Sequence, residues 1–210
     1  MSDFETLPAE PPYAAAQREV QRRLGRCLIR LQQYERLLKS MLAYRELDGD
    51  PAQLRAVVKA RMTAIKTLGP LIEEFTKNAL QLNSQGPRKA APKRKASDKA
   101  RIRMTQTIAV SPENHKVICA QLAELLALRN HLVHHFVAAS DLWSESGCAQ
   151  AASYLEESFR AIDAHYLSLR EMSTAANALL AELSHQLTDE LTQAESISST
   201  SQQPLRRYDA

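Results

Sequence analysis

Three side chains close together near residue 130 could act on a phosphate group. They are Arg129, Asn130 and His134, within the segment Arg-Asn-His-Leu-Val-His-His-Phe at positions 129–136. Histidine can exchange a proton near neutral pH, and arginine stays cationic and fits phosphate oxygens. An amide can orient either group. These residue types therefore indicate proton transfer next to a stabilised negative charge, and this chemistry requires no metal and no cofactor.

The position of Arg129 also sets this segment apart. Arg129 stands where the apolar stripe of a predicted helix would carry Leu or Ile, and a guanidinium on an apolar face is costly unless it is paired or lines a wet cleft. Arg129 and His134 differ by about 140° around an ideal helix, whereas Asn130 and His134 share a face. Either the helix ends near His134, or the two side chains converge on a cleft at its edge.

Other interpretations of the same residues remain open. Arg129 could bridge to a carboxylate on a neighbouring helix while His134 caps the helix end. His131 and His135 are four apart and could share a face as metal ligands, but the sequence shows no H-E-x-x-H motif and no third ligand. Arg61 lies on another apolar stripe, where it could contact a second phosphate or form an ion pair with a neighbouring helix.

Hydrophobic periodicity predicts four long helices that hold this segment. Apolar residues recur at spacings of three and four over 20–41, 54–82, 118–136 and 155–183. The first helix is expected to end near Leu47. Asp50-Pro51 and Ser111-Pro112 each supply an N-cap residue followed by a proline at the first helical position. Gly69-Pro70 interrupts the second stripe, so this segment is either one kinked helix or two abutting helices.

The predicted fold class is all-α, an up-down bundle of four long antiparallel helices with a basic loop between helices 2 and 3. A sheet of any size is not expected. The predicted organisation is a flexible N-terminal tail at 1–12, a helical-bundle domain at 13–191 that includes the loop at 84–110, and a disordered C-terminal tail at 192–210. The three cysteines are widely separated and predict reduced thiols. No segment is apolar enough for a membrane span, so we expect a cytoplasmic protein.

Basic charge is concentrated in the predicted loop. The strip at 88–103 has eight basic residues and one acid. The formal net charge of the whole chain is +3, so the rest of the chain has a net charge of −4. Such residues can neutralise a nucleic-acid backbone regardless of sequence. A solvated insert or a partner-docking segment is the alternative. The candidate RNA-binding residues are Lys93, Arg94, Lys95, Lys99, Arg101 and Arg103.

Arg129, Asn130 and His134 together resemble the R-N-x-x-x-H signature of the HEPN superfamily. The segment 67–72 and the Leu-Val-His context at 132–134 are also similar to that family, and the resemblance covers roughly residues 20–185. It implies a helical bundle that acts as a metal-independent endoribonuclease, often a toxin or an effector of defence against phage. It also implies a homodimer whose two motifs face each other, and a possible antitoxin or regulatory protein as partner.

On this basis His134 is expected to assist attack of the RNA 2′-hydroxyl on the adjacent phosphate, Arg129 to stabilise the transition state and Asn130 to orient the motif. One position departs from the family pattern. Toxins of this family that are encoded with a minimal nucleotidyltransferase commonly carry a tyrosine two residues after the histidine, and this chain has Phe136 there. Control through that tyrosine is not expected. The alternative function is a non-catalytic helical module that binds RNA or a protein.

Overall fold

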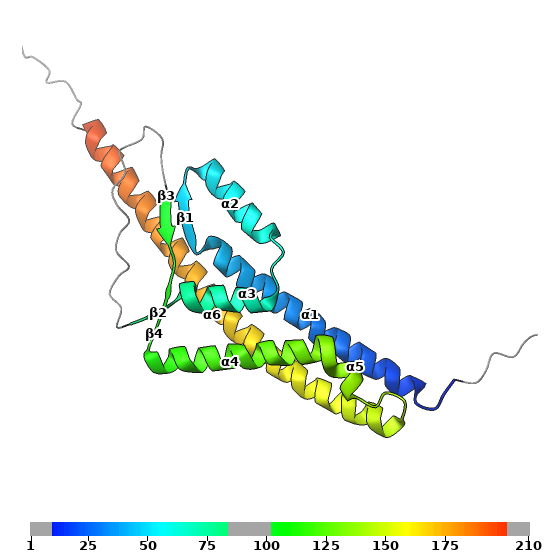
Figure 1. Ribbon diagram of the computed structural model, residues 1–210. Coiled ribbons are helices and arrows are strands. Elements are labelled where there is room, and N and C mark those ends of the chain that lie inside the picture. Colours follow the sequence, from blue (N-terminus) through cyan, green and yellow to red (C-terminus); the bar gives the residue numbers. More distant parts are fainter. Residues whose placement is uncertain (1–9, 84–101, 201–210) are drawn as a thin grey trace, which may run out of the picture. The chain divides into compact units, whose positions relative to one another are not determined.

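A computed structural model describes residues 10–83 and 102–200 (Figure 1). The chain divides into two units, residues 1–169 and residues 170–210, and the division lies within the last helix. The described residues are mostly helical, as the sequence predicts. None of their helices combines the length and the apolar character that crossing a membrane requires.

Helix α1 spans Ala14–Tyr44 and buries most of the predicted stripe, although Leu24 and Met41 of that stripe are only partly buried. It ends three residues earlier than expected, because Leu47 belongs to a short strand, β1, at Glu46–Gly49. Alternate residues of β1 are buried, which is the period of a strand and not of a helix. The buried residues of α1 are Val20, Cys27, Leu31, Tyr34, Leu38, Leu42 and Ala43.

The second predicted stripe forms two helices, α2 at Pro51–Thr63 and α3 at Leu68–Glu74. The predicted cap at Asp50 is confirmed, since Asp50 Oδ1 accepts a 2.9 Å hydrogen bond from the backbone N–H of Gln53. Pro70 lies in the first turn of α3, where a missing N–H breaks no helical bond. Neither predicted alternative for Gly69-Pro70 is found: the break lies at residues 64–67, before Gly69-Pro70, and the chain turns back there (Figure 1).

Residues 102–110, predicted to be part of the loop, form two strands. Strand β3 at Ile102–Thr105 pairs antiparallel with β1, and β4 at Ile108–Val110 pairs parallel with β2 at Leu80–Leu82. The prediction missed these strands because each has only three or four residues, too few for a clear period. The all-α expectation therefore needs this correction, and residues 84–101 of the predicted loop lie outside the described residues.

Helix α4 at Pro112–Asn130 begins at the predicted cap, where the Ser111 side chain accepts from the backbone N–H of Asn114. A π turn, η2 at His131–His135, and a short helix, α5 at Phe136–Ala139, follow it without a break. A second π turn, η1 at Phe75–Ala79, extends α3. Helix α6 spans Glu145–Thr200. Residues 192–200, predicted to be disordered, are thus helical: they contain no proline or glycine to end the helix.

Contacts between α1 and the first part of α6 fix the relative direction of these two helices. Arg23 Nη1 donates to the carbonyl oxygen of Ala152 at 3.2 Å. Two turns later along α1, Arg30 Nε lies 3.0 Å from the carboxylate of Asp163. The later residue of α1 contacts the later residue of α6, so α1 and the first part of α6 run parallel. An up-down bundle of four helices would make them antiparallel, and the turn between α2 and α3 accounts for the extra reversal.

The core of the first unit joins residues from α1, α3, α4 and α6. Leu38, Leu68, Leu125 and Leu155 are each 1% exposed or less, and Phe75 of η1 and Phe136 of α5 are buried with them. All three cysteines are free. Burial raises the pKa of the Cys27 thiol to about 11, so this side chain is a neutral thiol packed in the core.

Candidate active site

The Arg129–His134 segment lies where helix α4 widens into the π turn η2. In a π turn each backbone N–H bonds the carbonyl five residues back, and the N–H of Phe136 bonds the carbonyl of His131 in this way. This wider turn reduces the angle between residues five apart, and the side chains of Arg129 and His134 meet. The separation of about 140° for an ideal α-helix therefore does not apply, and the helix does not end at His134.

The three candidate side chains are in direct contact. Arg129 Nη1 donates a 3.2 Å hydrogen bond to Asn130 Oδ1 and lies 3.4 Å from His134 Nε2. A guanidinium can only donate, so Nε2 is the acceptor in this second contact. His134 and Asn130 are exposed, whereas the Arg129 side chain is only 21% exposed. The structure thus brings together an exposed proton acceptor and a partly buried, permanent positive charge.

Glu35 of α1 is the acidic neighbour of this group. Its Oε1 lies 3.9 Å from Arg129 Nε, and about three quarters of the Glu35 side chain is covered. This ion pair is the contact that the structural interpretation of Arg129 predicts. The distance between the two charged groups is well beyond the 2.7–2.9 Å of a charge-assisted hydrogen bond. The ion pair involves Nε, so it leaves Nη1 to other partners. Arg129 is therefore held toward α1 while Nη1 remains directed to Asn130 and His134.

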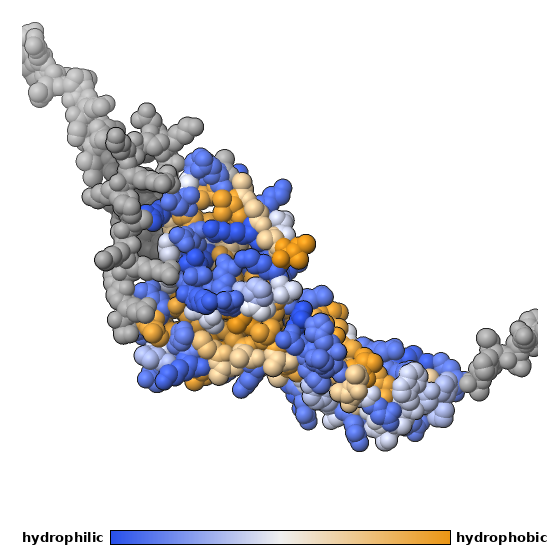
Figure 2. Space-filling model, viewed as in Figure 1, coloured by the Kyte–Doolittle hydropathy of each residue, from blue (hydrophilic) through white to orange (hydrophobic). Residues whose placement is uncertain are grey.

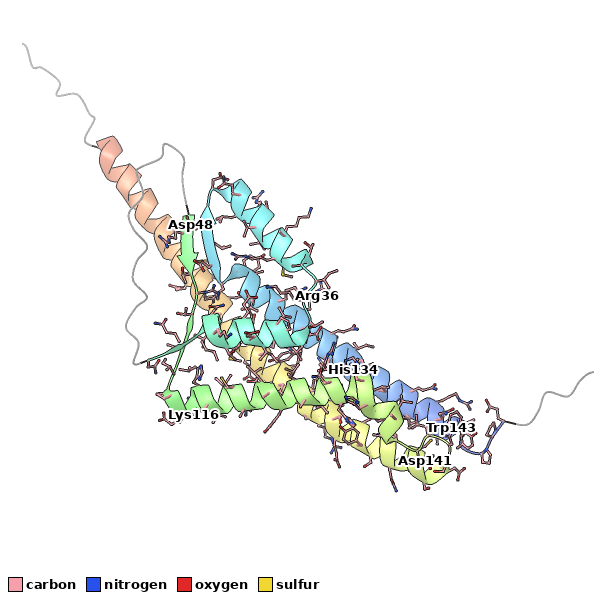
Figure 3. The ribbon with its side chains drawn as sticks, in the orientation of Figure 1. Arg36, Asp48, Lys116, His134, Asp141 and Trp143 are labelled. Carbon is pink, nitrogen blue, oxygen red and sulfur yellow. The ribbon has the colours of Figure 1, made fainter. Side chains whose placement is uncertain are left out.

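The core and helix α1 support the π turn. Leu132 and Phe136 are buried, and they hold η2 against the core. Helix α1 contacts η2 directly. Figure 3 labels His134 near the end of α4, and this part of the chain, η2, is the part that contacts α1. The buried apolar positions face the core, so the polar residues between them face outward.

Two further histidines and a tyrosine extend the site. The His131 ring lies 5.6 Å from the Tyr154 ring of α6 and 6.4 Å from the His135 ring, measured between centroids. The ring of His135 is 6.2 Å from that of His134. The part of the chain that the structure describes contains no group of three or more His, Cys, Asp or Glu side chains placed to hold a metal ion. The pair His131 and His135 therefore has no third ligand among these residues.

The predicted basic strip and the motif are not brought together where the structure describes both. Of the six candidate RNA-binding residues only Arg103 is described in the structure; it is exposed on β3, opposite Asp48 of β1. Figure 3 shows Asp48 and His134 in clearly separate parts of the first unit, so Arg103 is not part of the Arg129 site. Lys93, Arg94, Lys95, Lys99 and Arg101 lie outside the described residues.

Arg61 contacts backbone carbonyls, and no ion pair is found for it among the residues that the structure describes. Its Nη1 donates to the backbone carbonyls of Ala43 at 3.0 Å and Glu46 at 2.7 Å. The last carbonyls of a helix have no partners within that helix, so Arg61 caps the end of α1. This residue is better explained by a structural role than by phosphate binding.

Sequence reasoning did not select Glu35 or Tyr154. Glu35 follows the stripe residue Tyr34, and Tyr154 precedes the stripe residue Leu155, so each stands at the edge of an apolar stripe. That position is a weak signal, because polar residues border every amphipathic stripe. The proximity of these two residues to the motif depends on how α1 and α6 pack beside η2, which one sequence does not specify.

Comparison with known proteins adds no relative. No family model matches this chain, and neither a curated protein nor a solved structure is similar to it. The resemblance to the HEPN superfamily therefore remains a prediction from the residues of the motif. Any function assigned to the chain has to be argued from the geometry around Arg129 and His134.

Proposed function

We propose that this chain is a metal-independent endoribonuclease of the HEPN type that acts as a toxin or as an effector of phage defence in the cytoplasm. The observation that carries the proposal is the 3.4 Å contact between Arg129 Nη1 and His134 Nε2 in an exposed π turn. π turns within α-helices are frequent at functional sites. The proposal needs a helical scaffold that holds these two side chains together, and it does not depend on an up-down order of helices.

The proposed reaction uses groups that are present in the chain and in RNA. When the substrate phosphate takes over the hydrogen bond of Arg129 Nη1, His134 Nε2 is free to accept the proton of the 2′-hydroxyl, and the resulting oxygen forms a bond to the adjacent phosphorus. The bond from phosphorus to the 5′-oxygen breaks, and that oxygen takes up a proton as it leaves. Arg129 stabilises the negative charge on the phosphate oxygens during the displacement, and Asn130 orients the guanidinium. The products are a 2′,3′-cyclic phosphate and a 5′-hydroxyl.

A homodimer is part of the proposal. A single chain offers one Arg129 and one His134 to the phosphate, whereas a two-fold axis near 129–136 would supply a second histidine that can protonate the leaving oxygen. Val133 and Val137, one turn apart beside the motif, are 44% and 67% exposed. On the face seen in Figure 2, apolar residues gather over the region of α3 and α4. An antitoxin or regulatory protein is the further partner we expect.

The second candidate is a non-catalytic helical module that binds RNA or a protein through the same surface. The contact between Arg129 and Glu35 favours it, because a guanidinium held by a carboxylate can have a purely structural role. The long distance of that ion pair and the exposure of His134 favour the enzyme.

The deciding experiment compares RNA cleavage by the purified wild type, Arg129→Ala and His134→Ala in excess EDTA. The matched controls are Lys116→Ala for the basic residue and His115→Ala for the histidine. Both positions lie near the start of α4 (Lys116 is labelled in Figure 3). We expect cleavage by the wild type and both controls, and none by the two motif variants. In parallel, expression of the wild type should arrest growth and expression of His134→Ala should not.

Two results would overturn the proposal. One is a pair of folded motif variants that still cut RNA, which would exclude this site from the reaction. The other is loss of wild-type cleavage in EDTA, which would make the reaction metal-dependent. If the wild type and its variants bind RNA but none of them cleaves it, the chain is better explained as the non-catalytic module.

A further inference from the structure

A continuous row of aromatic rings leads away from the Arg129–His134 pair. The rings of His134, His135, His131 and Tyr154 follow one another at centroid distances of 6.2, 6.4 and 5.6 Å. The Tyr154 ring then stacks on Phe136 at 6.3 Å with an angle of 15° between the planes. The first three rings come from η2 and the fourth from α6, so two elements build the row.

The two ends of this row differ in burial. Phe136 is 1% exposed and belongs to the core, so it supports Tyr154 from below. Tyr154 itself is 38% exposed, and His135 and His134 are also exposed. Core packing accounts for Phe136, but it does not account for aromatic rings that remain open to solvent beside a cationic side chain. This aromatic row is therefore available to a ligand that also contacts Arg129.

Single-stranded RNA combines the two chemistries that such a surface fits. Its phosphates are attracted to a guanidinium, and its unpaired bases stack on aromatic side chains, Tyr and His among them. Duplex RNA keeps its bases stacked on one another and cannot offer them to the row. A DNA base has the same flat face, so the row distinguishes unpaired strands from duplexes but does not distinguish RNA from DNA. That second distinction depends on the 2′-hydroxyl, which reacts at His134.

We propose that the aromatic row, with Tyr154 and His135 as its exposed platforms, stacks unpaired bases next to the phosphate that Arg129 and His134 act on. This inference rests on the proposed function and adds the substrate class, a single-stranded segment. Tyr154 is the residue on which the inference depends most, because it is fixed between His131 and Phe136 and has the largest ring of the exposed three.

Binding can be measured without cleavage by using a single-stranded 2′-O-methyl oligoribonucleotide with the wild-type protein and with Tyr154→Leu. Leucine keeps an apolar side chain over Phe136 and removes the ring. The control Tyr44→Leu changes a tyrosine of similar exposure at the end of α1. Arg23 contacts Ala152, so Tyr44 lies about 30 Å further along α1 than the level of Tyr154.

We expect Tyr154→Leu to weaken binding of the single strand between about five-fold and about a hundredfold, the range for removal of one base stack. Tyr154→Phe should bind like the wild type, because it keeps the ring. An oligonucleotide of the same length with abasic sites should bind both proteins equally. His135→Leu provides a second test at an exposed position and should also weaken binding.

Three results would overturn the inference in distinguishable ways. If wild type and Tyr154→Leu bind the single strand equally while the wild type cleaves RNA, the platform is wrong and the proposed function stands. If Tyr154→Leu converts a dimer to a monomer in light scattering, the row is a contact between two copies of this chain. If the wild type neither binds nor cleaves RNA, the proposed function fails and the platform fails with it.

Discussion

His134 Nε2 lies 3.4 Å from Arg129 Nη1 although the two residues are five positions apart on one helix. An α-helix would point them about 140° apart. The π turn at His131–His135 reduces this difference, because its hydrogen bonds join residues five apart and each residue turns through a smaller angle. The spacing of the motif and the local shape of the helix therefore belong together.

This relationship predicts which histidine position can serve the site. In an α-helix position 133 would be the closer neighbour of Arg129, since residues four apart share a face. We expect Val133→His in a His134→Ala background to remain inactive in RNA cleavage, because the structure places position 134 in contact with Arg129 Nη1. Recovery of cleavage by this double variant would show that the segment works as an ordinary α-helix.

The proposed dimer makes a prediction about Val137, which is exposed beside the motif. Val137→Lys should place a charge in the interface and convert the dimer to a monomer in light scattering, with loss of RNA cleavage. Val117→Lys is the matched control, an exposed valine near the start of α4 that should stay dimeric and active. A wild type that is monomeric at micromolar concentration and fully active would exclude the dimer as a requirement.

The sequence predicted the helices well where a period or a cap was present. Most of the stripe of α1 and the caps at Asp50 and Ser111 are confirmed, because spacing and capping chemistry act locally. Within α6, Leu155, Ile162 and Leu169 are buried as the stripe predicts. These features depend on neighbours within a few residues, and one sequence contains that information.

Features that depend on long-range packing were missed. The strands β1 and β3 stabilise each other across more than fifty residues, and neither has a clear pattern alone. The turn between α2 and α3 makes α1 and α6 parallel, which periodicity does not reveal. The approach of Glu35 and Tyr154 to the motif follows from that packing. The π turn was also missed, although the poor fit of Arg129 and His134 to an ideal helix pointed to irregular geometry there.

The basic strip makes a prediction about salt dependence that comes from the sequence alone. Replacing Lys93, Arg94 and Lys95 by Gln should weaken RNA binding and flatten its dependence on salt, by about 0.7 in the logarithmic slope for each phosphate that is no longer neutralised. The fold should be unaffected. A control that replaces the exposed residues Arg55, Lys59 and Lys116 by Gln should change the slope less. Equal slopes for the strip variant and the wild type would mean that the strip does not contact RNA.

Half-buried His165 of α6 makes the stability depend on pH. Burial lowers its pKa from the ordinary 6.5, although the charge of Glu124 opposes this. In the unfolded chain His165 therefore binds a proton near pH 6.5, whereas in the folded chain it binds that proton only at a lower pH. Stability is then fully present above that pH and falls as the pH drops through the lower, folded-state value.

Denaturant unfolding above and below the ordinary histidine pKa of about 6.5 tests this sign. The loss of unfolding free energy on acidification should be smaller in His165→Gln than in the wild type. Glu124→Gln should enlarge the loss, since it removes the charge that favours protonated His165. The same loss in wild type and His165→Gln would contradict the assignment.

The central claim is that Arg129 and His134 cleave RNA through its own 2′-hydroxyl, and the most direct measurement uses one ribonucleotide at a time. A set of otherwise 2′-O-methyl oligonucleotides, each with a single ribose at a different position, is incubated with the protein in EDTA, and the products are weighed by mass spectrometry. The account predicts cuts only on the 3′ side of the single ribose, with a 2′,3′-cyclic phosphate and a 5′-hydroxyl, and none with His134→Ala. Cuts beside 2′-O-methyl sugars, or the same products from folded His134→Ala, would contradict it.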